Sequence, residues 1–288
     1  INNKSKCDVD KPIIVYLCNF SNINMQLSDY DVKFLYNNLD RGKSIRSRIV
    51  ASEELVKSGA LNPNILFSTY KIKQPSTSGG VWARAKLVQE LDRIIQYDTN
   101  NYVYLSKHLN IMINEFLKNK LLTAFAISYG KKLKLIKSNY PPLNDIILII
   151  SILSGEYDDI IEKNIIVDPK LKNLINVLSK RNKFLLNANF KDYDLINIKN
   201  TELKNAILKA SNGIYSEKII LTNDTKNRYL KHQDGLVLLN AILKISNSSN
   251  YDIEDIQTGL ALLVKLGLIN DFKAISNELL IMEYFKKI

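Results

Sequence analysis

The chain has 288 residues, of which 46% are hydrophobic and 24% are charged, a composition that excludes an intrinsically disordered protein. Its longest apolar run, residues 143–153, is much shorter than the roughly 20 residues that a membrane-spanning helix needs, so we expect no transmembrane segment. The formal net charge of +11 admits an anionic partner. However, the lysines are scattered and no motif of the common nucleic-acid-binding modules is present, so we do not expect nucleic acid to be that partner.

The two cysteines, Cys7 and Cys18, lie close together near the start of the chain. They are too few for a disulfide scaffold or for a zinc site. Either they are unrelated thiols, or they form a disulfide that closes an N-terminal strap, which requires an oxidising compartment. The sequence begins at Ile1, as it would after cleavage of a leader, although a chosen expression start explains this equally well. We expect an exported, periplasmic protein, with the cytoplasm as the alternative.

Apolar residues recur every three to four positions along most of the chain, which predicts α-helices. Residues 1–27 lack this period and are expected to form an extended strap, in which 13–17 is a candidate short strand. An N-terminal array of helical hairpins is expected over residues 28–139, with helices at 28–36, 44–57, from 63, from 81, at 102–118 and at 121–137. Ser44 is expected to cap the second of these helices, with Ile49 facing inward and Glu53 and Glu54 outward.

Two prolines at 141 and 142 predict the start of a C-terminal array, residues 140–288. Its clearest element is a final hairpin. Gly267 is expected to end the helix that begins near Asp252, and Asp271 is expected to cap the next helix. The inward positions of these two helices are Ile253, Ile256, Leu260 and Leu263, and then Phe272, Ile275, Leu279 and Met282. Because one hairpin cannot bury its apolar face alone, we expect an all-α fold, an irregular α-solenoid of antiparallel hairpins.

Two turns, ILSGEYDDII at 152–161 and VKLGLINDFKAI at 264–275, place a glycine at a helix end and acidic residues at the next helix start. They resemble the turns of tetratricopeptide-like hairpins, although the full pattern of about 34 residues is absent. The succession SGALNPNILFSTYK, GGVWARAKLVQELD and LLVKLGLINDFKAIS is similar to that of uncharacterised exported helical proteins of proteobacteria. This resemblance implies a helical fold and an envelope location, and it transfers no activity.

The best candidate for a binding site is the loop and helix start that end at Arg84. Ser78, Gly79 and Gly80 precede a predicted helix, whose free backbone N–H groups can bind an anion, and Arg84 lies one turn inside. Trp82, the only tryptophan, can present a surface to a partner, or it can fill the core while the loop merely connects two hairpins. No Gly-Lys-Ser/Thr follows the glycines, so this is not a P-loop.

A second candidate is the arginine cluster of Arg41, Arg46 and Arg48. Arginine suits planar, bidentate contacts, so these residues are candidates for binding an acidic partner. Ion pairs with Glu53 or Glu54 are the alternative. The densest lysine group, within residues 131–137, is either a solvated face or a site for an anionic partner.

No pattern in the sequence predicts a catalytic or metal site. His108 and His232 have no Cys, Asp or Glu at ligand spacing, and the common catalytic motifs are absent, so we expect no cofactor and no metal. The acidic pairs are expected at helix starts or on the surface, at 53–54, 158–159 and 254–255.

We therefore expect a non-enzymatic interaction or scaffold module of the cell envelope, which binds a protein or peptide through a helical-repeat surface. One alternative is a glycan-acting enzyme of the helical-superhelix type, which needs two carboxylates facing each other across a cleft. A second alternative is a nucleic-acid-binding helical repeat, which needs a continuous basic stripe. The sequence does not indicate an oligomeric state.

Overall fold

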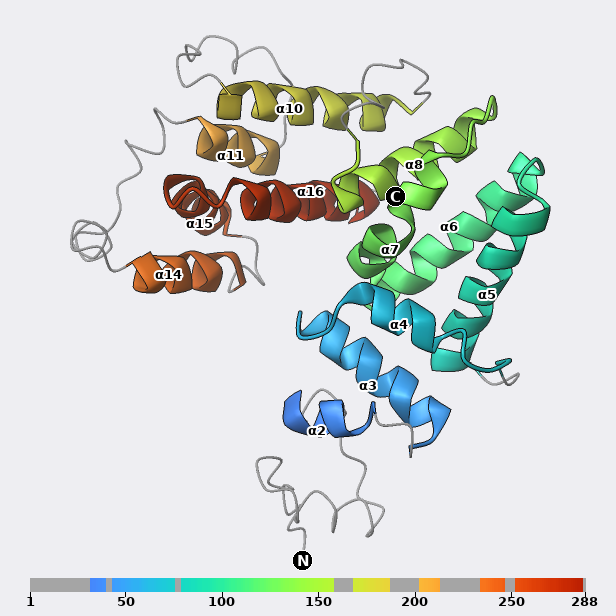
Figure 1. Cartoon of the computed structure of the whole chain (residues 1–288). Helices are drawn as coiled ribbons and strands as arrows, with labels where there is room; N and C mark the ends of the chain where they lie inside the picture. Colours follow the sequence, from blue (N-terminus) through green and yellow to red (C-terminus); the bar gives the residue numbers. More distant parts are fainter. Residues whose placement is uncertain are drawn as a thin grey trace, which may run out of the picture. The chain divides into compact units, whose positions relative to one another are not determined.

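The structure is a computed structural model that describes residues 32–39, 43–75, 79–157, 168–186, 202–212, 234–246 and 252–286 (Figure 1). These residues form twelve α-helices and no β-strand, which confirms the all-α prediction. No helix in this part of the chain is long and apolar enough to cross a membrane. Several predictions fall outside the described residues, namely the strap at 1–27, Cys7, Cys18, Arg41, Ser78, His232 and the acidic pair at 158–159.

The chain divides into two units, Ile1–Ser154 and Gly155–Ile288. The helices of the first unit are α2 (Val32–Asn37), α3 (Ile45–Lys57), α4 (Pro63–Thr69), α5 (Val81–Tyr97), α6 (Tyr102–Lys118), α7 (Leu122–Lys134) and α8 (Pro141–Ser154). The helices of the second unit are α10 (Pro169–Leu186), α11 (Glu202–Ser211), α14 (Asp234–Ser246), α15 (Ile253–Lys265) and α16 (Ile269–Lys286). Helix α8 therefore belongs to the first unit, although the prolines at its start suggested a boundary there. Proline is well tolerated in the first turn of a helix, where its missing N–H has no intrahelical partner.

The core of the first unit contains a cluster of aromatic rings. Phe67 of α4 lies within 5.4 to 6.1 Å of the rings of Phe116, Phe125 and Tyr129, which come from α6 and α7. Phe116 and Phe125 stack at 5.4 Å with an angle of 17° between their planes. Pairs of this kind add roughly 0.5–1.5 kcal/mol each beyond the burial of their area. These rings hold α4 and α6 against α7.

Helices α7 and α8 approach each other closely at Gly130. A Cβ at this position would lie 2.4 Å from the Oγ and 2.7 Å from the Cβ of Ser154. Only glycine therefore allows this packing. The middle and end of α8, residues 146–153, are buried throughout, which agrees with the interpretation of this apolar run as a buried helix.

Helix ends follow the predicted chemistry at several positions. The Ser44 side chain accepts a hydrogen bond from the backbone N–H of Ser47, 3.1 Å away, as expected of a cap. Gly267 has a φ of 76°, and the N–H of the next residue bonds back to Leu263, which closes α15. The prediction that Asp271 caps α16 is wrong, because α16 begins at Ile269 and places Asp271 in its first turn.

In the second unit, α15 packs against α11, α14 and α16, while α10 packs against α11 and α16. The inward face of α15 is confirmed at Ile256, Leu260 and Leu263. In α16, however, only Phe272 of the four predicted inward residues is fully buried. The buried residues of α16 are Phe272, Ser276, Asn277, Leu280 and Ile281.

Helices α10 and α16 are far apart in sequence but in contact. The hydroxyl of Tyr284 donates to Oδ2 of Asp168, immediately before α10, at 2.6 Å. In a regular repeat array, each helical pair contacts only the pairs next to it in sequence. The contact between α10 and α16 joins helices that are not neighbours in sequence. The irregular solenoid therefore stays a prediction, while the all-helical class is established.

Candidate functional site

The predicted binding residue Arg84 lies in the interior of the first unit, with 6% of its surface exposed. Its Nε and Nη2 donate to the two carboxylate oxygens of Glu53 on α3 at 2.9 and 2.6 Å. Its Nη1 donates to Oε1 of Glu115 on α6 at 3.1 Å. Because all three nitrogens are engaged inside the protein, Arg84 does not contribute to an anion site at the surface.

Glu53 was expected on the surface, but only 2% of it is exposed, so that prediction is wrong. The signal was in the sequence. Glu53 follows the buried Ile49 by four positions, and residues with this spacing share one face of a helix. The partner, Arg84, is 31 residues further along the chain, and no local pattern connects the two.

Tyr70 and Asn119 complete this group of side chains, which we call the Arg84 network (Glu53, Tyr70, Arg84, Glu115 and Asn119). The Tyr70 hydroxyl donates to Glu53 at 2.7 Å, and Asn119 donates to Glu115 at 3.0 Å. Burial raises the pKa of Tyr70, and the negative charge of Glu53 raises it further, so Tyr70 stays a donor. Burial alone would lower the pKa of Arg84, but the hydrogen bonds and charge of Glu53 outweigh this effect and raise it.

The loop before α5 does not assemble with Arg84 into one site. Gly79 and Gly80 are exposed, and Gly80 has a φ of 69°, a backbone conformation that suits glycine. Trp82 is half-buried and so lies between the two alternatives considered for it. The described part of the predicted anion site thus has exposed backbone on one side and an internally paired arginine on the other.

The described part of the arginine cluster also does not form the predicted ion pairs with Glu53 and Glu54. Arg46 is exposed and Arg48 is half-buried. Within the described residues, Glu53 pairs with Arg84, and Glu54 pairs with Lys57 at 2.7 Å. The alternative of ion pairs between this cluster and Glu53 or Glu54 is therefore wrong for Arg46 and Arg48.

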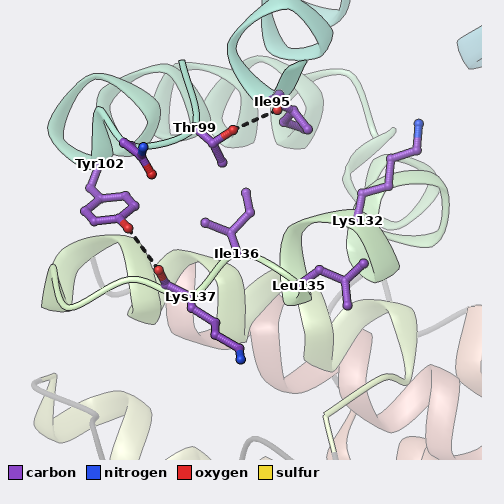
Figure 2. A pocket seen from close by; sticks show the side chains of 8 residues that line it. Ile95, Thr99, Tyr102, Lys132, Leu135, Ile136 and Lys137 are labelled. Atoms are coloured by element: carbon purple, nitrogen blue, oxygen red, sulfur yellow. Dashed lines mark hydrogen bonds between the residues drawn. The ribbon is translucent and has the colours of Figure 1, made fainter. Parts of the chain in front are cut away.

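A pocket of about 400 Å³ lies where the end of α5, the start of α6 and the end of α7 meet (Figure 2). Its lining is mostly apolar and comprises Ile95, Thr99, Asn100, Tyr102, Lys132, Leu135, Ile136 and Lys137. Figure 2 shows the side chain of Ile136 at the centre, with Ile95 and Thr99 opposite it and Tyr102 at one side. The volume is in the lower part of the range of roughly 300–1,000 Å³ that is typical of ligand sites.

The frame of this pocket is held by hydrogen bonds to the backbone. The Tyr102 hydroxyl donates to the carbonyl oxygen of Lys137 at 3.0 Å, which ties the chain after α7 to the start of α6. The Thr99 hydroxyl donates to the carbonyl oxygen of Ile95 at 2.8 Å, which closes the end of α5. A frame fixed in advance lowers the conformational entropy that the protein must lose when a ligand binds.

An exposed apolar side chain extends the pocket onto the surface, because the lining residue Leu135 is 80% exposed. The helix 121–137 was predicted to continue through Leu135, but α7 ends at Lys134. The N–H groups of Leu135 and Ile136 bond to carbonyls three residues back, which tightens the last turn and redirects both side chains.

The positive edge of the pocket is anchored to the core. The ammonium of Lys132 lies 5.4 Å from the ring centroid of Tyr129. The Tyr129 hydroxyl donates to Asp92 at 2.9 Å, and Asp92 pairs with Lys71 at 2.5 Å. The sequence indicates the lysine group but not the pocket, because the other side of the site comes from a second segment, residues 95–102, which no local pattern connects with residues 132–137.

In the described part of the second unit, Arg181 on α10 is a fully buried charge. It donates to Oγ of Ser276 at 2.6 Å, to Oδ1 of Asn277 at 2.7 Å and to the hydroxyl of Tyr157. These contacts connect α10 to α16 and explain why two polar residues of α16 are buried. The guanidinium is enclosed, so its role is structural.

The remaining chemistry-bearing side chains form no centre within the described ranges. His108 is buried, and its Nε2 lies 2.9 Å from the carbonyl oxygen of Leu87. No group of three or more His, Cys, Asp and Glu side chains that could hold a metal ion occurs there. In comparisons with known proteins, no family model matches the chain, and neither a curated protein nor a solved structure matches it.

Proposed function

We propose that the chain is a non-enzymatic interaction module whose first unit binds a protein or peptide partner at the pocket between α5, α6 and α7. The observation that carries the proposal is the continuity of an open apolar pocket with the exposed side chain of Leu135. A preformed pocket with projecting apolar side chains around it is the usual form of a site that receives an anchor residue from a partner.

The alternative of a glycan-acting enzyme receives no support from the acidic side chains of this unit. Such an enzyme needs two carboxylates that face a substrate across a cleft. Glu53 is buried and accepts hydrogen bonds from Arg84 and Tyr70, and Glu115 is bound by Arg84 and Asn119. Neither carboxylate is placed to exchange a proton with an external ligand.

The finer architecture and the location are part of the same proposal. We retain an irregular array of helical hairpins, supported by the antiparallel hairpin that the short connection between α15 and α16 imposes. We retain the cell envelope as the compartment, supported by the resemblance to exported helical proteins.

The proposal is tested by selecting a displayed library of random peptides of about a dozen residues on the purified protein. Selected peptides are then measured against Leu135→Asp and against a matched control, Ile111→Asp. Ile111 lies on α6, is 56% exposed and is not part of the pocket, so both variants place a carboxylate at an exposed apolar position. We expect Leu135→Asp to abolish binding and Ile111→Asp to preserve it. A library that yields no peptide sensitive to Leu135→Asp would refute the proposed function.

A further inference from the structure

We infer that the segment which fills this pocket is acidic, with a bulky apolar side chain flanked by carboxylates that pair with Lys132 and Lys137. The inference rests on the proposed function and adds the chemistry of the partner to it. Three features of the pocket carry it: an apolar centre, two separate ammonium groups at its edge, and the contacts that hold the Lys132 ammonium and the Lys137 backbone in place.

The centre of the pocket has no place for a charge. Ile95, Leu135 and Ile136 supply aliphatic surface. Of the three uncharged polar lining residues, Thr99 and Tyr102 direct their hydroxyls to backbone carbonyls (Figure 2), and Asn100 is exposed to solvent. An apolar side chain can enter without leaving a polar group unsatisfied, whereas a carboxylate placed there would lose its hydration without compensation. The part of the partner that enters is therefore apolar.

The two lysines lie on either side of this centre. Figure 2 shows both side chains extending away from Ile136, with Lys132 beyond Leu135 and Lys137 on the far side. Both side chains are exposed, and both residues line the pocket. A segment whose apolar residue enters the pocket must continue past these two ammonium groups, so carboxylates next to the anchor meet opposite charge.

Lys132 is restrained at its ammonium and Lys137 at its backbone before a partner arrives. The ammonium of Lys132 lies over the ring of Tyr129, and Tyr129 is buried and bonded to Asp92. The backbone of Lys137 is held by the hydroxyl of Tyr102, and no ion pair engages its ammonium within the described residues. Placing opposite charges across an interface raises the association rate and selects the partner, and restraint lowers the cost of ordering the side chains.

Acidic groups around the pocket do not cancel this charge. The carboxylate of Asp92 is already bound by Lys71 and Tyr129. Asp98, at the end of α5, is exposed and next to the lining residue Thr99 in sequence, and it is the acid that a basic partner would use. Two lysines, Lys132 and Lys137, line the pocket itself, so the local balance favours an acidic segment.

A polypeptide fits these features better than a nucleic acid. Nucleic-acid affinity grows with the number of phosphates that are contacted along a continuous basic path. Here an aliphatic centre separates the two ammonium groups. A peptide with an apolar residue between two carboxylates places each of its groups against the matching part of the pocket. An acidic peptide is thus the occupant to which we commit.

The experiment compares each selected peptide with a version in which every Asp and Glu is replaced by the isosteric Asn and Gln. Affinities are measured by fluorescence anisotropy. We expect the amide version to bind about tenfold or more weakly, and the acidic version to lose affinity as the ionic strength rises. The double variant K132E/K137E should lose the acidic peptide, while K86E/K118E, which makes the same change in net charge at exposed positions outside the pocket, should retain it.

The two proposals fail in different ways. If Leu135→Asp abolishes binding but acidic and amide peptides bind equally, the partner is not acidic and the proposed function stands. If binding does not respond to Leu135→Asp, the proposed function is wrong as well. Binding to anionic lipid vesicles that is lost in K132E/K137E, without any preference among peptides, would overturn the inference in favour of a membrane surface. So would self-association that Leu135→Asp abolishes, since it would identify a second copy as the occupant.

Discussion

The substitution Arg84→Leu tests the Arg84 network most directly, because it removes the positive charge and leaves the negative one buried. Glu53 would keep one of its three hydrogen bonds, the one from Tyr70, in a site where only 2% of the residue is exposed. Removing one partner of a buried ion pair costs about 3–5 kcal/mol. Folded domains are stable by only about 5–15 kcal/mol, so this loss is a large fraction of the total.

Arg93→Leu is the matched control, because it removes an arginine from the same helix. Arg93 pairs with Glu90 at 2.6 Å, but 58% of the arginine side chain is exposed. An ion pair at such an exposed position contributes little to stability, so Arg84→Leu should destabilise the unit far more than Arg93→Leu. Replacing the network by apolar groups, with Glu53→Met, Tyr70→Phe and Arg84→Met together, should recover most of the stability, since no buried charge is then left unpaired.

Urea unfolding followed by the fluorescence of Trp82 measures this effect in the first unit, since Trp82 is the only tryptophan of the chain. A loss of 3–5 kcal/mol corresponds to a melting temperature lower by about 6 to 20 °C for a unit of this size. If Arg84→Leu unfolds within about 1 kcal/mol of the native protein and no differently from Arg93→Leu, the reasoning about this network is refuted.

Three further predictions concern other contacts. Gly130→Ala should destabilise the first unit by about 1–3 kcal/mol in urea unfolding, and adding Ser154→Gly should restore most of this; a neutral Gly130→Ala would contradict the close approach of α7 and α8. The hydrogen bond from Arg93 lowers the pKa of Glu90 to about 2. Glu90 therefore stabilises the fold above its ordinary pKa near 4.5 and loses this contribution as the pH falls towards 2. On acidification, the Glu90→Gln variant should lose less free energy of unfolding than the native protein, by less than about 1 kcal/mol. If the urea midpoints of both proteins change equally with pH, the ion pair between Glu90 and Arg93 does not contribute to stability. Arg181→Lys should destabilise the second unit nearly as much as Arg181→Met, because an ammonium cannot reproduce the planar set of donors; full rescue by lysine in a thermal melt would show that charge alone suffices.

The sequence predicted buried helix faces well where one uniform apolar period decides the packing. In α6, the apolar residues that recur at three and four positions are all buried, namely Leu105, Leu109, Met112 and Phe116. The same reasoning failed in α16, where Ser276 and Asn277 are buried because Arg181 draws them inward. The spacing of apolar residues cannot predict that a polar residue is buried, when that residue is buried because it binds a charged side chain from a distant helix.

The candidate site was predictable only in part, for a related reason. The lysine group at 131–137 was visible, but the pocket depends on the end of α7 at Lys134, which turns Leu135 out of the helix. The apolar period continues past that point, so the sequence predicted a longer helix. Arg84 was predicted to help bind an anion at the surface, but it is buried and its partner is Glu53 from another helix.

The buried position of Arg181 has a consequence for the order in which this protein can form. Its partner Asn277 follows it by 96 residues, so the guanidinium cannot be enclosed until α16 has left the ribosome. At a synthesis rate of about 5–20 residues per second, this interval lasts about 5 to 20 s. Until then water hydrates the guanidinium, because burying it without its partners on α16 would cost free energy, so α10 cannot complete its packing before the end of the chain has been made.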